Sequence, residues 1–99
     1  MFLYNITFNI TDAHHEALVH HLKNDFVPEA IGSNLTIGHK LLRLLTEIEN
    51  NGQTFSIQFF FADQEDVINF DEAIIPALNN VHRKFEGEYV YFSTLLEEI

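Results

Sequence analysis

Four of the six histidines of this 99-residue chain lie in one short segment, HHEALVHH, at residues 14–21. Imidazole nitrogens bind metal ions and exchange protons near neutral pH, so the segment has the residue types of a metal site or of a catalytic base. Paired histidines of a helical metal site are spaced i, i+4 or i, i+3. None of these four has a histidine at either spacing. We therefore predict no metal site here, and nothing in the sequence calls for a cofactor.

Helical geometry separates the four histidines, because each residue of a helix is rotated by about 100° from the previous one. The apolar face of a helix through this segment comprises Leu18, Val19, Leu22 and Phe26. His15 falls within that arc, His14 and His21 share a flank, and His20 points away from the core. His15 is therefore our candidate catalytic acid or base. The alternative, which is the commoner fate, is a half-buried histidine hydrogen-bonded to the backbone.

The charge of the chain argues against several classes of partner. Fifteen Asp and Glu against five Lys and Arg give a formal net charge of −10. Such a field repels phosphate backbones and anionic lipid, so we predict neither nucleic acid nor membrane as a partner. No apolar run approaches membrane-spanning length, and MFLYNITFNI lacks the positive start of a signal peptide. We therefore expect a cytoplasmic protein.

Motifs of common catalytic sites do not occur in the sequence. The chain has no cysteine, which excludes disulfides, a thiol nucleophile and a thiolate metal site. It has no glycine-rich phosphate loop, no nucleophile elbow and no Ser-His-Asp pattern. Whether the protein is an enzyme therefore stays open at this level.

The pattern of residues predicts four strands. Residues 2–10 alternate between apolar and polar, which is typical of a strand. Residues 36–49 and 54–61 flank Asn50-Asn51-Gly52, and Asn-Gly between two such runs is the strongest short-range hairpin signal. The last predicted strand covers residues 88–97.

Two helical regions are predicted between these strands. The first begins after Thr11-Asp12, reaches about Phe26 and is broken by Val27-Pro28, after which residues 28–31 can form one more helical turn. The second runs from Asp63 to about Phe85, and Pro76 predicts a kink or a split within it. The order β-α-β-β-α-β predicts a ferredoxin-like α+β sandwich, in which a four-stranded antiparallel sheet carries both helices on one face. Residues 1–99 would form a single domain.

The alternation also predicts what each face of the sheet carries. Tyr4, Ile6 and Phe8, with Phe55, Ile57, Phe59 and Phe61, should lie under the helices. The opposite, open face should carry Asn5, Thr7 and Asn9 from the first strand and Ser56, Gln58 and Phe60 from the third. If Leu42 and Leu44 face the helices, then Leu41, Arg43 and Leu45 join the open face.

A face of this mixed composition is either simply solvated or covered by a partner. Leu41, Leu45 and Phe60 favour a partner. We predict a homodimer in which two open faces pack together as a dimeric α/β barrel, since twofold dimers are the commonest assemblies. Arg43 and Gln58 would then form hydrogen bonds in the interface or line a small cavity.

Several segments together resemble a small bacterial family catalogued as a domain of unknown function. They are LYNITFNI, FVPEAI, LLRLL, ENNG, TFSIQFF, PAL and the closing FSTLLEEI, and they span almost the whole chain. The resemblance implies a ferredoxin-like domain related in shape to dimeric α/β-barrel proteins such as the antibiotic-biosynthesis monooxygenases. It implies no established activity, cofactor or substrate.

At the level of single residues, Asn5, Thr7, Arg43 and Gln58 match polar positions of the family pattern, and His15 matches a histidine of its first helix. The chain departs from the pattern at three positions. Leu18 and His21 stand where the family often has Trp, and Phe26 stands where it has His. A role that depends on an indole or on that second histidine is therefore not carried over.

Two functional hypotheses follow. The first is a homodimeric module without established catalytic activity. The second is a small-molecule enzyme of the antibiotic-biosynthesis monooxygenase or isomerase type, with a substrate held between sheet and helices. In the second, His15 would be the acid or base, and Arg43 with Gln58, or Asn5, would orient the substrate. This enzyme hypothesis predicts an apolar cavity of roughly 300 Å³ or more beside a polar group.

Overall fold

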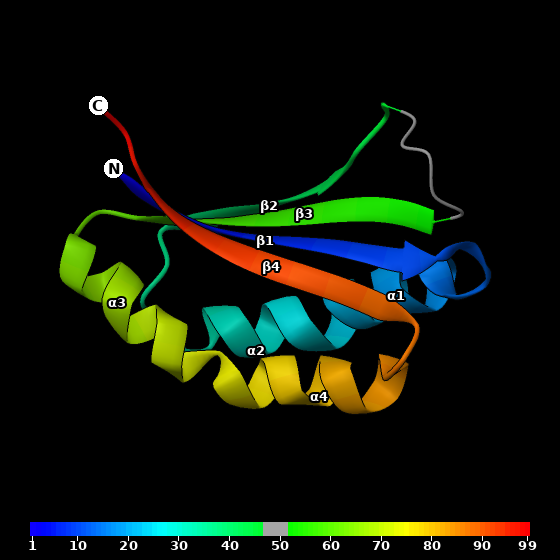
Figure 1. The fold of residues 1–99 in the computed structure, drawn as a ribbon. Coiled ribbons are helices and arrows are strands. Elements are labelled where there is room, and N and C mark those ends of the chain that lie inside the picture. The colour runs from blue at the N-terminus through cyan, green and yellow to red at the C-terminus, as the bar shows by residue number, and fades with distance from the viewer. Residues whose placement is uncertain (47–51) are drawn as a thin grey trace.

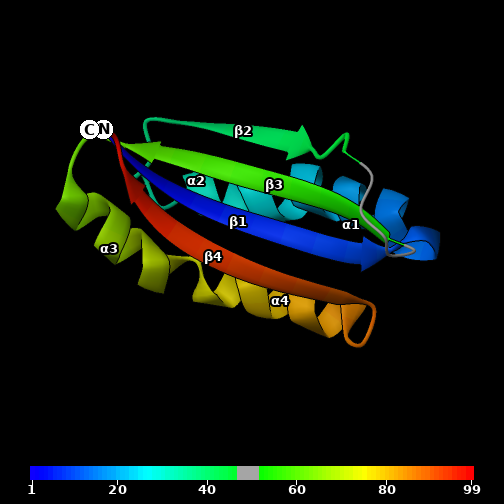
Figure 2. The ribbon, with the colours of Figure 1, turned by 45° about the horizontal axis from the view of Figure 1, so that its top comes forward.

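The computed structural model describes residues 1–46 and 52–99, and in it every helix lies on one side of a single antiparallel sheet (Figure 1). The sheet comprises β1 (Phe2–Thr11), β2 (Gly38–Arg43), β3 (Gly52–Phe61) and β4 (Tyr89–Glu97). Its spatial order is β2-β3-β1-β4, so the first and third strands are central (Figure 2). The four predicted strands and the β-α-β-β-α-β order are confirmed.

The helical layer is divided into short pieces. Between β1 and β2 lie η1 (Asp12–His14), α1 (His15–His21), the π-helical turn η2 (Leu22–Phe26) and α2 (Val27–Ile31). Between β3 and β4 lie α3 (Gln64–Ala73) and α4 (Ile75–Phe85). No helix among residues 1–46 and 52–99 is long and apolar enough to span a membrane.

The two prolines act differently from one another. Pro76 stands in the first turn of α4, just after α3 has ended, so the predicted split is confirmed. Val27-Pro28 was predicted to break the first helix, and residues 28–31 were predicted to add one more helical turn. The added turn is present within α2, but the chain stays helical through Pro28 without a break. The wider π turn η2 directly precedes α2, and Pro28 stands in the first turn of α2, where its missing N–H is not needed.

The second strand differs from the prediction in both length and orientation. It ends at Arg43, although Leu44 N still donates to Thr54 O at 2.9 Å. The expected extension towards residue 49 and the turn residues Asn50 and Asn51 fall largely outside the described residues.

Strand pairing places Leu41 opposite Ile57 and Arg43 opposite Phe55. Directly opposed residues share a face of the sheet, so Leu41 and Arg43 lie on the helix side. The prediction that these two join the open face was therefore wrong. In the motif LLRLL, both sets of alternate residues contain leucine. Hydrophobicity alone therefore does not determine which set faces the helices.

Aromatic rings fill the space between sheet and helices. All seven predicted core residues of β1 and β3 are buried, at 0–2% exposure, together with Ile10. Phe70 of α3 lies at the centre of this layer, with its ring centroid 4.8 Å from that of Phe59, 5.0 Å from Phe61 and 5.4 Å from Tyr4. The core is therefore closely packed where the sheet meets α3.

Candidate functional site

The face of the sheet turned away from the helices, the open face, carries no Asp or Glu at any of its strand positions. Figure 2 shows this face with the helices lying behind it. Strand pairing assigns to it Leu3, Asn5, Thr7 and Asn9 of β1, Thr54, Ser56, Gln58 and Phe60 of β3, Gly38, Lys40 and Leu42 of β2, and Val90, Phe92, Thr94 and Leu96 of β4. The predicted placement of Asn5, Thr7, Gln58 and Phe60 is confirmed.

A polar strip runs along the centre of the open face, and its side chains hydrogen-bond to one another. Ser56 Oγ donates to Asn5 Oδ1 at 2.5 Å, and Asn5 Nδ2 donates to Thr7 Oγ1 at 3.2 Å. Asn9 Nδ2 donates to Thr54 Oγ1 at 2.9 Å. Covering this strip would therefore leave few polar groups without a partner.

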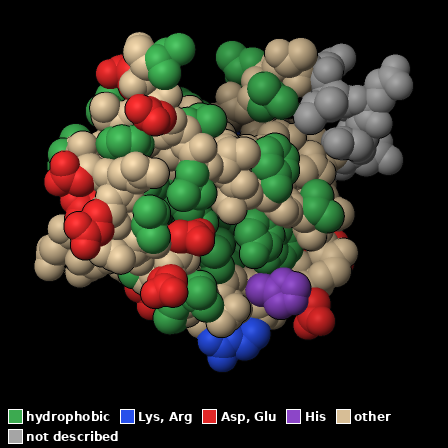
Figure 3. Space-filling model, turned by 60° about the vertical axis from the view of Figure 1, so that its left-hand side comes forward, with side chains coloured by type: hydrophobic (Ala, Val, Ile, Leu, Met, Phe, Trp, Pro, Cys, Tyr) green, Lys and Arg blue, Asp and Glu red, His purple; other side chains and the backbone are tan. Residues whose placement is uncertain are grey.

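Apolar side chains flank the strip on both sides. On β4, Val90 is 69% exposed, Phe92 60% and Leu96 50%, and on β2 Leu42 is 42% exposed. Figure 3, which shows a different side of the molecule, has Asp and Glu among the hydrophobic side chains and Lys, Arg and His only at its lower edge. The strand positions described for the open face therefore carry no acidic group, in contrast to the side shown in Figure 3.

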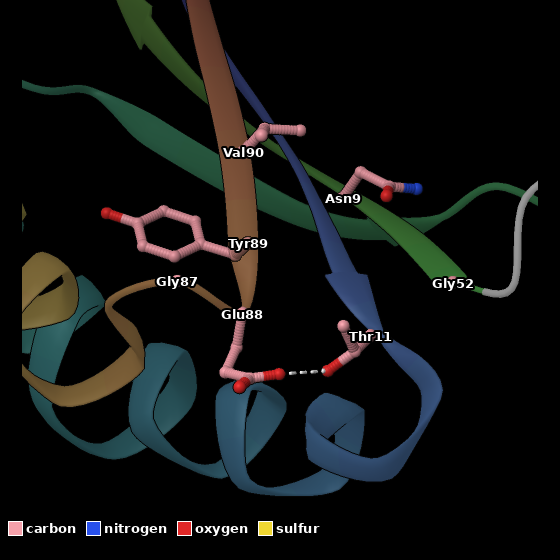
Figure 4. A pocket seen from close by; sticks show the side chains of 7 residues that line it. All are labelled: Asn9, Thr11, Gly52, Gly87, Glu88, Tyr89 and Val90. Carbon is pink, nitrogen blue, oxygen red and sulfur yellow. Dashed lines mark hydrogen bonds between the residues drawn. The ribbon is translucent and has the colours of Figure 1, made fainter.

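A hollow of about 320 Å³ lies at the end of the open face, where β1 ends and β4 begins (Figure 4). In this view Asn9 and Val90 extend on one side of β4 and the Tyr89 ring on the other. Thr11 Oγ1 donates to Glu88 Oε2 at 3.0 Å, and His14 Nδ1 lies 3.0 Å from the same hydroxyl. These bonds tie the end of β1 to the start of β4, which is a structural role.

His15 lies in a second hollow, of about 260 Å³, between α1 and the end of β2. Its Nδ1 is 2.7 Å from the carbonyl oxygen of Asp12. A carbonyl only accepts, so Nδ1 carries the proton and Nε2 of the neutral ring is left as an acceptor. The structure therefore has the half-buried histidine hydrogen-bonded to the backbone that was the alternative prediction for His15. Its Nε2 has a free lone pair.

Arg43 lies in the same hollow as His15. Its guanidinium carbon is 5.4 Å from the centroid of the Phe55 ring, a cation–π contact. Val19, Lys23 and Asn24 line the same hollow. The structure thus brings His15 and Arg43 together but places Asn5, Thr7 and Gln58 on the other side of the sheet. Leu45, which is 88% exposed, follows β2 and belongs to no strand.

His21 is the buried histidine of the segment, at 7% exposure, whereas His15 has 25% of its side chain exposed. Sequence geometry had placed His21 on a flank. The π turn that begins directly after it and the packing of its ring against Phe85, at 5.9 Å, account for the difference. Its Nδ1 lies 3.2 Å from Asp25 Oδ2 at an angle that makes no hydrogen bond. Burial lowers the pKa of His21, while Asp25 opposes that shift.

We expect this lowered pKa to make folding weaker in mild acid. Between the folded pKa and 6.5, the unfolded chain binds a proton at His21 that the folded chain does not, so the free energy of unfolding falls as pH falls through that window. Replacing the imidazole in His21→Leu should remove this contribution. Thermal unfolding of both proteins at pH values of about 7.5 and 5.5, on either side of the ordinary histidine pKa, measures it. An equal loss of stability in the two proteins would contradict the assignment.

Tyr4 is a second buried ionisable residue that the sequence did not single out. Burial first, and then its hydrogen bond to Asp71, raise its pKa to about 12. The hydroxyl therefore stays protonated and donates to Asp71 Oδ1 at 2.6 Å, which fixes β1 to α3. A phenol held in this way is no acid or base near neutral pH. Within the described ranges, no group of three His, Asp or Glu side chains is placed to hold a metal ion.

The comparisons with known proteins agree on the fold. A family model described as "Domain of unknown function (DUF4286)" matches residues 1–99. A search of curated protein sequences finds no match.

Among solved structures, the chain is similar to an ethyl tert-butyl ether d (EthD) family protein from Bacillus halodurans, with 16% identity, TM-score 0.74 and full coverage of both chains. It is similar to a dimeric ferredoxin-like protein from an uncultured marine organism, with 10% identity, TM-score 0.70 and coverage of 99% of this chain and 98% of the other. A structure named antibiotic biosynthesis monooxygenase has 11% identity, TM-score 0.67 and coverage of 100% and 99%. The fold is therefore ferredoxin-like, as predicted.

Proposed function

The chain belongs to the family described as domain of unknown function DUF4286, and we propose that it is a single-domain protein that works as a homodimer, with two open faces packed against each other. The observation that carries the proposal is the absence of carboxylates from the strand positions that the structure describes on this face, in a chain with fifteen Asp and Glu. Two protomers of formal charge −10 repel each other, and a face free of acidic groups is where they approach at the lowest cost.

Packing and hydrogen bonding support the same assembly. The exposed side chains of Leu42, Phe92 and Leu96 would be removed from water, at about 25 cal/mol per Å² of apolar surface. Asn5, Ser56, Asn9 and Thr54 of the polar strip are already hydrogen-bonded within the protomer, so burying these four side chains would cost little. Dimeric ferredoxin-like proteins occur among the structural neighbours.

The size of the open face is also sufficient. Four strands about 4.8 Å apart, of which β1, β3 and β4 have nine or ten residues and β2 has six, cover at most roughly 19 by 30 Å at about 3.3 Å per residue. Side chains standing on this area raise its accessible surface towards the roughly 800 Å² per partner of a standard interface.

Sedimentation equilibrium of the unmodified protein at micromolar concentration tests the proposal. We expect a species of twice the 11.5 kDa chain mass. A single species of 11.5 kDa over the whole concentration range would refute it.

A second candidate function is supported by the hollow that contains His15 and Arg43. The basic Nε2 of His15 and the guanidinium of Arg43 form a pair that could remove a proton from a small molecule and orient it. A structural neighbour is named antibiotic biosynthesis monooxygenase. The hollow lies at the edge of the sheet and not under it, where aromatic rings fill the space.

Oxygen uptake with a panel of small organic molecules that carry a carboxylate, which Arg43 could orient, tests this second function. We expect His15→Gln to lower any activity by about 10²–10⁴-fold, the usual contribution of a general base. His20→Gln, a change of the same kind in the same hollow, serves as the control and should keep activity within a few-fold. Equal activity in His15→Gln and the unmodified protein would eliminate His15 as the base.

We also propose a cytoplasmic location, for which the support is a chain that has no cysteine and so forms no disulfide. Fractionation of cells that produce the protein would test it.

A further inference from the structure

A groove along the edge strand β2 gathers cations in an otherwise acidic protein. Two neighbouring hollows form it, of about 260 and 270 Å³, and both are lined by Lys23. Arg43 lines the first, and Val27, His39 and Leu41 line the second. Glu16 is the one carboxylate among the lining residues.

The spacing of the two walls explains why the hollows form one groove. On the helical wall, Val19, Lys23 and Val27 recur every four residues, a rise of about 6 Å. On the strand wall, His39, Leu41 and Arg43 recur every two residues, a rise of about 6.6 Å. Val19 shares a hollow with Arg43, and Val27 shares one with His39, so the two walls run antiparallel and in step.

The cations of the groove are not neutralised by the protein. Across residues 1–46 and 52–99, no ion pair joins Lys23 or Arg43 to a carboxylate. Among the described residues, the contact of Arg43 is with the Phe55 ring, and this cation–π contact leaves the guanidinium N–H groups available. Lys40 also lines the second hollow, although its ammonium lies 5.9 Å from the centroid of the Phe60 ring on the open face.

We propose that this groove binds a small carboxylate with an apolar body. Arg43 would hold the carboxylate with two parallel hydrogen bonds, the geometry for which a guanidinium is suited, and Lys23 would add a second charge. The apolar body would lie along Leu41 and Val27 in the other hollow. This inference rests on the second function proposed above and adds the class of ligand to it.

A titration of the isotope-labelled protein with octanoate, followed by amide chemical shifts, tests the proposal. We expect saturable shifts at Val19, Lys23, Leu41 and Arg43. Arg43→Gln should weaken binding at least tenfold, whereas Arg83→Gln, which removes the same charge from α4, should change it less than twofold. Glu16→Gln should strengthen binding by about two- to fivefold because it removes the carboxylate.

Several outcomes would overturn the inference. These are no saturable shift at millimolar octanoate, equal weakening in Arg43→Gln and Arg83→Gln, or equal affinity for inorganic phosphate, which has no apolar body. The test separates this inference from the others. If octanoate binds through Arg43 but the protein takes up no oxygen, the proposed enzyme activity is refuted and the proposed binding groove is retained. The groove lies on the helix side of the sheet. A monomer that binds octanoate would therefore refute only the proposed homodimer.

Discussion

Phe92→Asp should convert the protein from a dimer into a monomer at micromolar concentration. Phe92 is 60% exposed and lies near the middle of the apolar flank formed by β4. An aspartate there would face the second copy across the interface without a partner, and it would bring the first carboxylate onto a face that has none. Loss of a central aromatic residue and burial of an unpaired charge together cost several kcal/mol, which is a factor of at least about 10² in the dissociation constant. Light scattering of both proteins over a range of concentrations measures the change.

Ile68→Asp is the matched control. Ile68 is a comparably exposed apolar residue, at 54%, but it lies on α3 in the helical layer. This variant should remain a dimer. Dissociation of both variants would indicate a general effect of added charge, and retention of the dimer by Phe92→Asp would remove the open face as the interface.

Phe70→Ala should destabilise the fold more than truncation of any exposed side chain. Phe70 is fully buried and its ring contacts those of Tyr4, Phe59 and Phe61, which joins α3 to the two central strands. Truncation of a buried phenylalanine costs about 3–5 kcal/mol because transfer and cavity effects add. For a chain of this size, that corresponds to a fall in Tm of roughly 15–30 °C. Calorimetry at a fixed protein concentration measures it.

Two variants control for this result. Ile68→Ala, on the same helix but exposed, should change the free energy of unfolding by less than about 1 kcal/mol. Phe70→Leu should retain most of the volume and lose less than Phe70→Ala. Equal effects of Phe70→Ala and Ile68→Ala would contradict the central place of Phe70 in the core.

The sequence was sufficient for the fold where one physical signal dominated. Alternation with period two placed β1, β3 and their core residues, because one face of each is apolar throughout. Pro76 marked the boundary between α3 and α4, since a proline belongs in the first turn of a helix.

Prediction failed where two signals competed. In LLRLL, leucines would lie on both faces of the strand. Only the pairing of β2 with Phe55 and Ile57 of β3 determines on which face of the sheet Arg43 lies. The π turn η2 changes the rotation that follows from 3.6 residues per turn. Packing of the neighbouring α4 then decides that His21 is buried and that His15 is not, and no local pattern reports it.

The candidate site was predicted only in its parts. His15 and Arg43 were both singled out, but their meeting in one hollow depends on the side taken by β2. Lys23 was missed, because a single lysine on a helix gives no signal until the facing strand is known. The strand positions of β1, β3 and β4 already contain the signal for the open face, because none of those that alternate onto it is Asp or Glu.

Intermolecular nuclear Overhauser effects test the central claim most directly. In a sample mixed from labelled and unlabelled protein, an isotope-filtered experiment detects only contacts between two copies. We expect contacts between the methyl groups of Leu42, Val90 and Leu96 and the ring of Phe92, which all lie on the open face. Contacts at Ile68 or Ile75 of the helical layer in their place, or no intermolecular contacts at all, would contradict a dimer formed through that face.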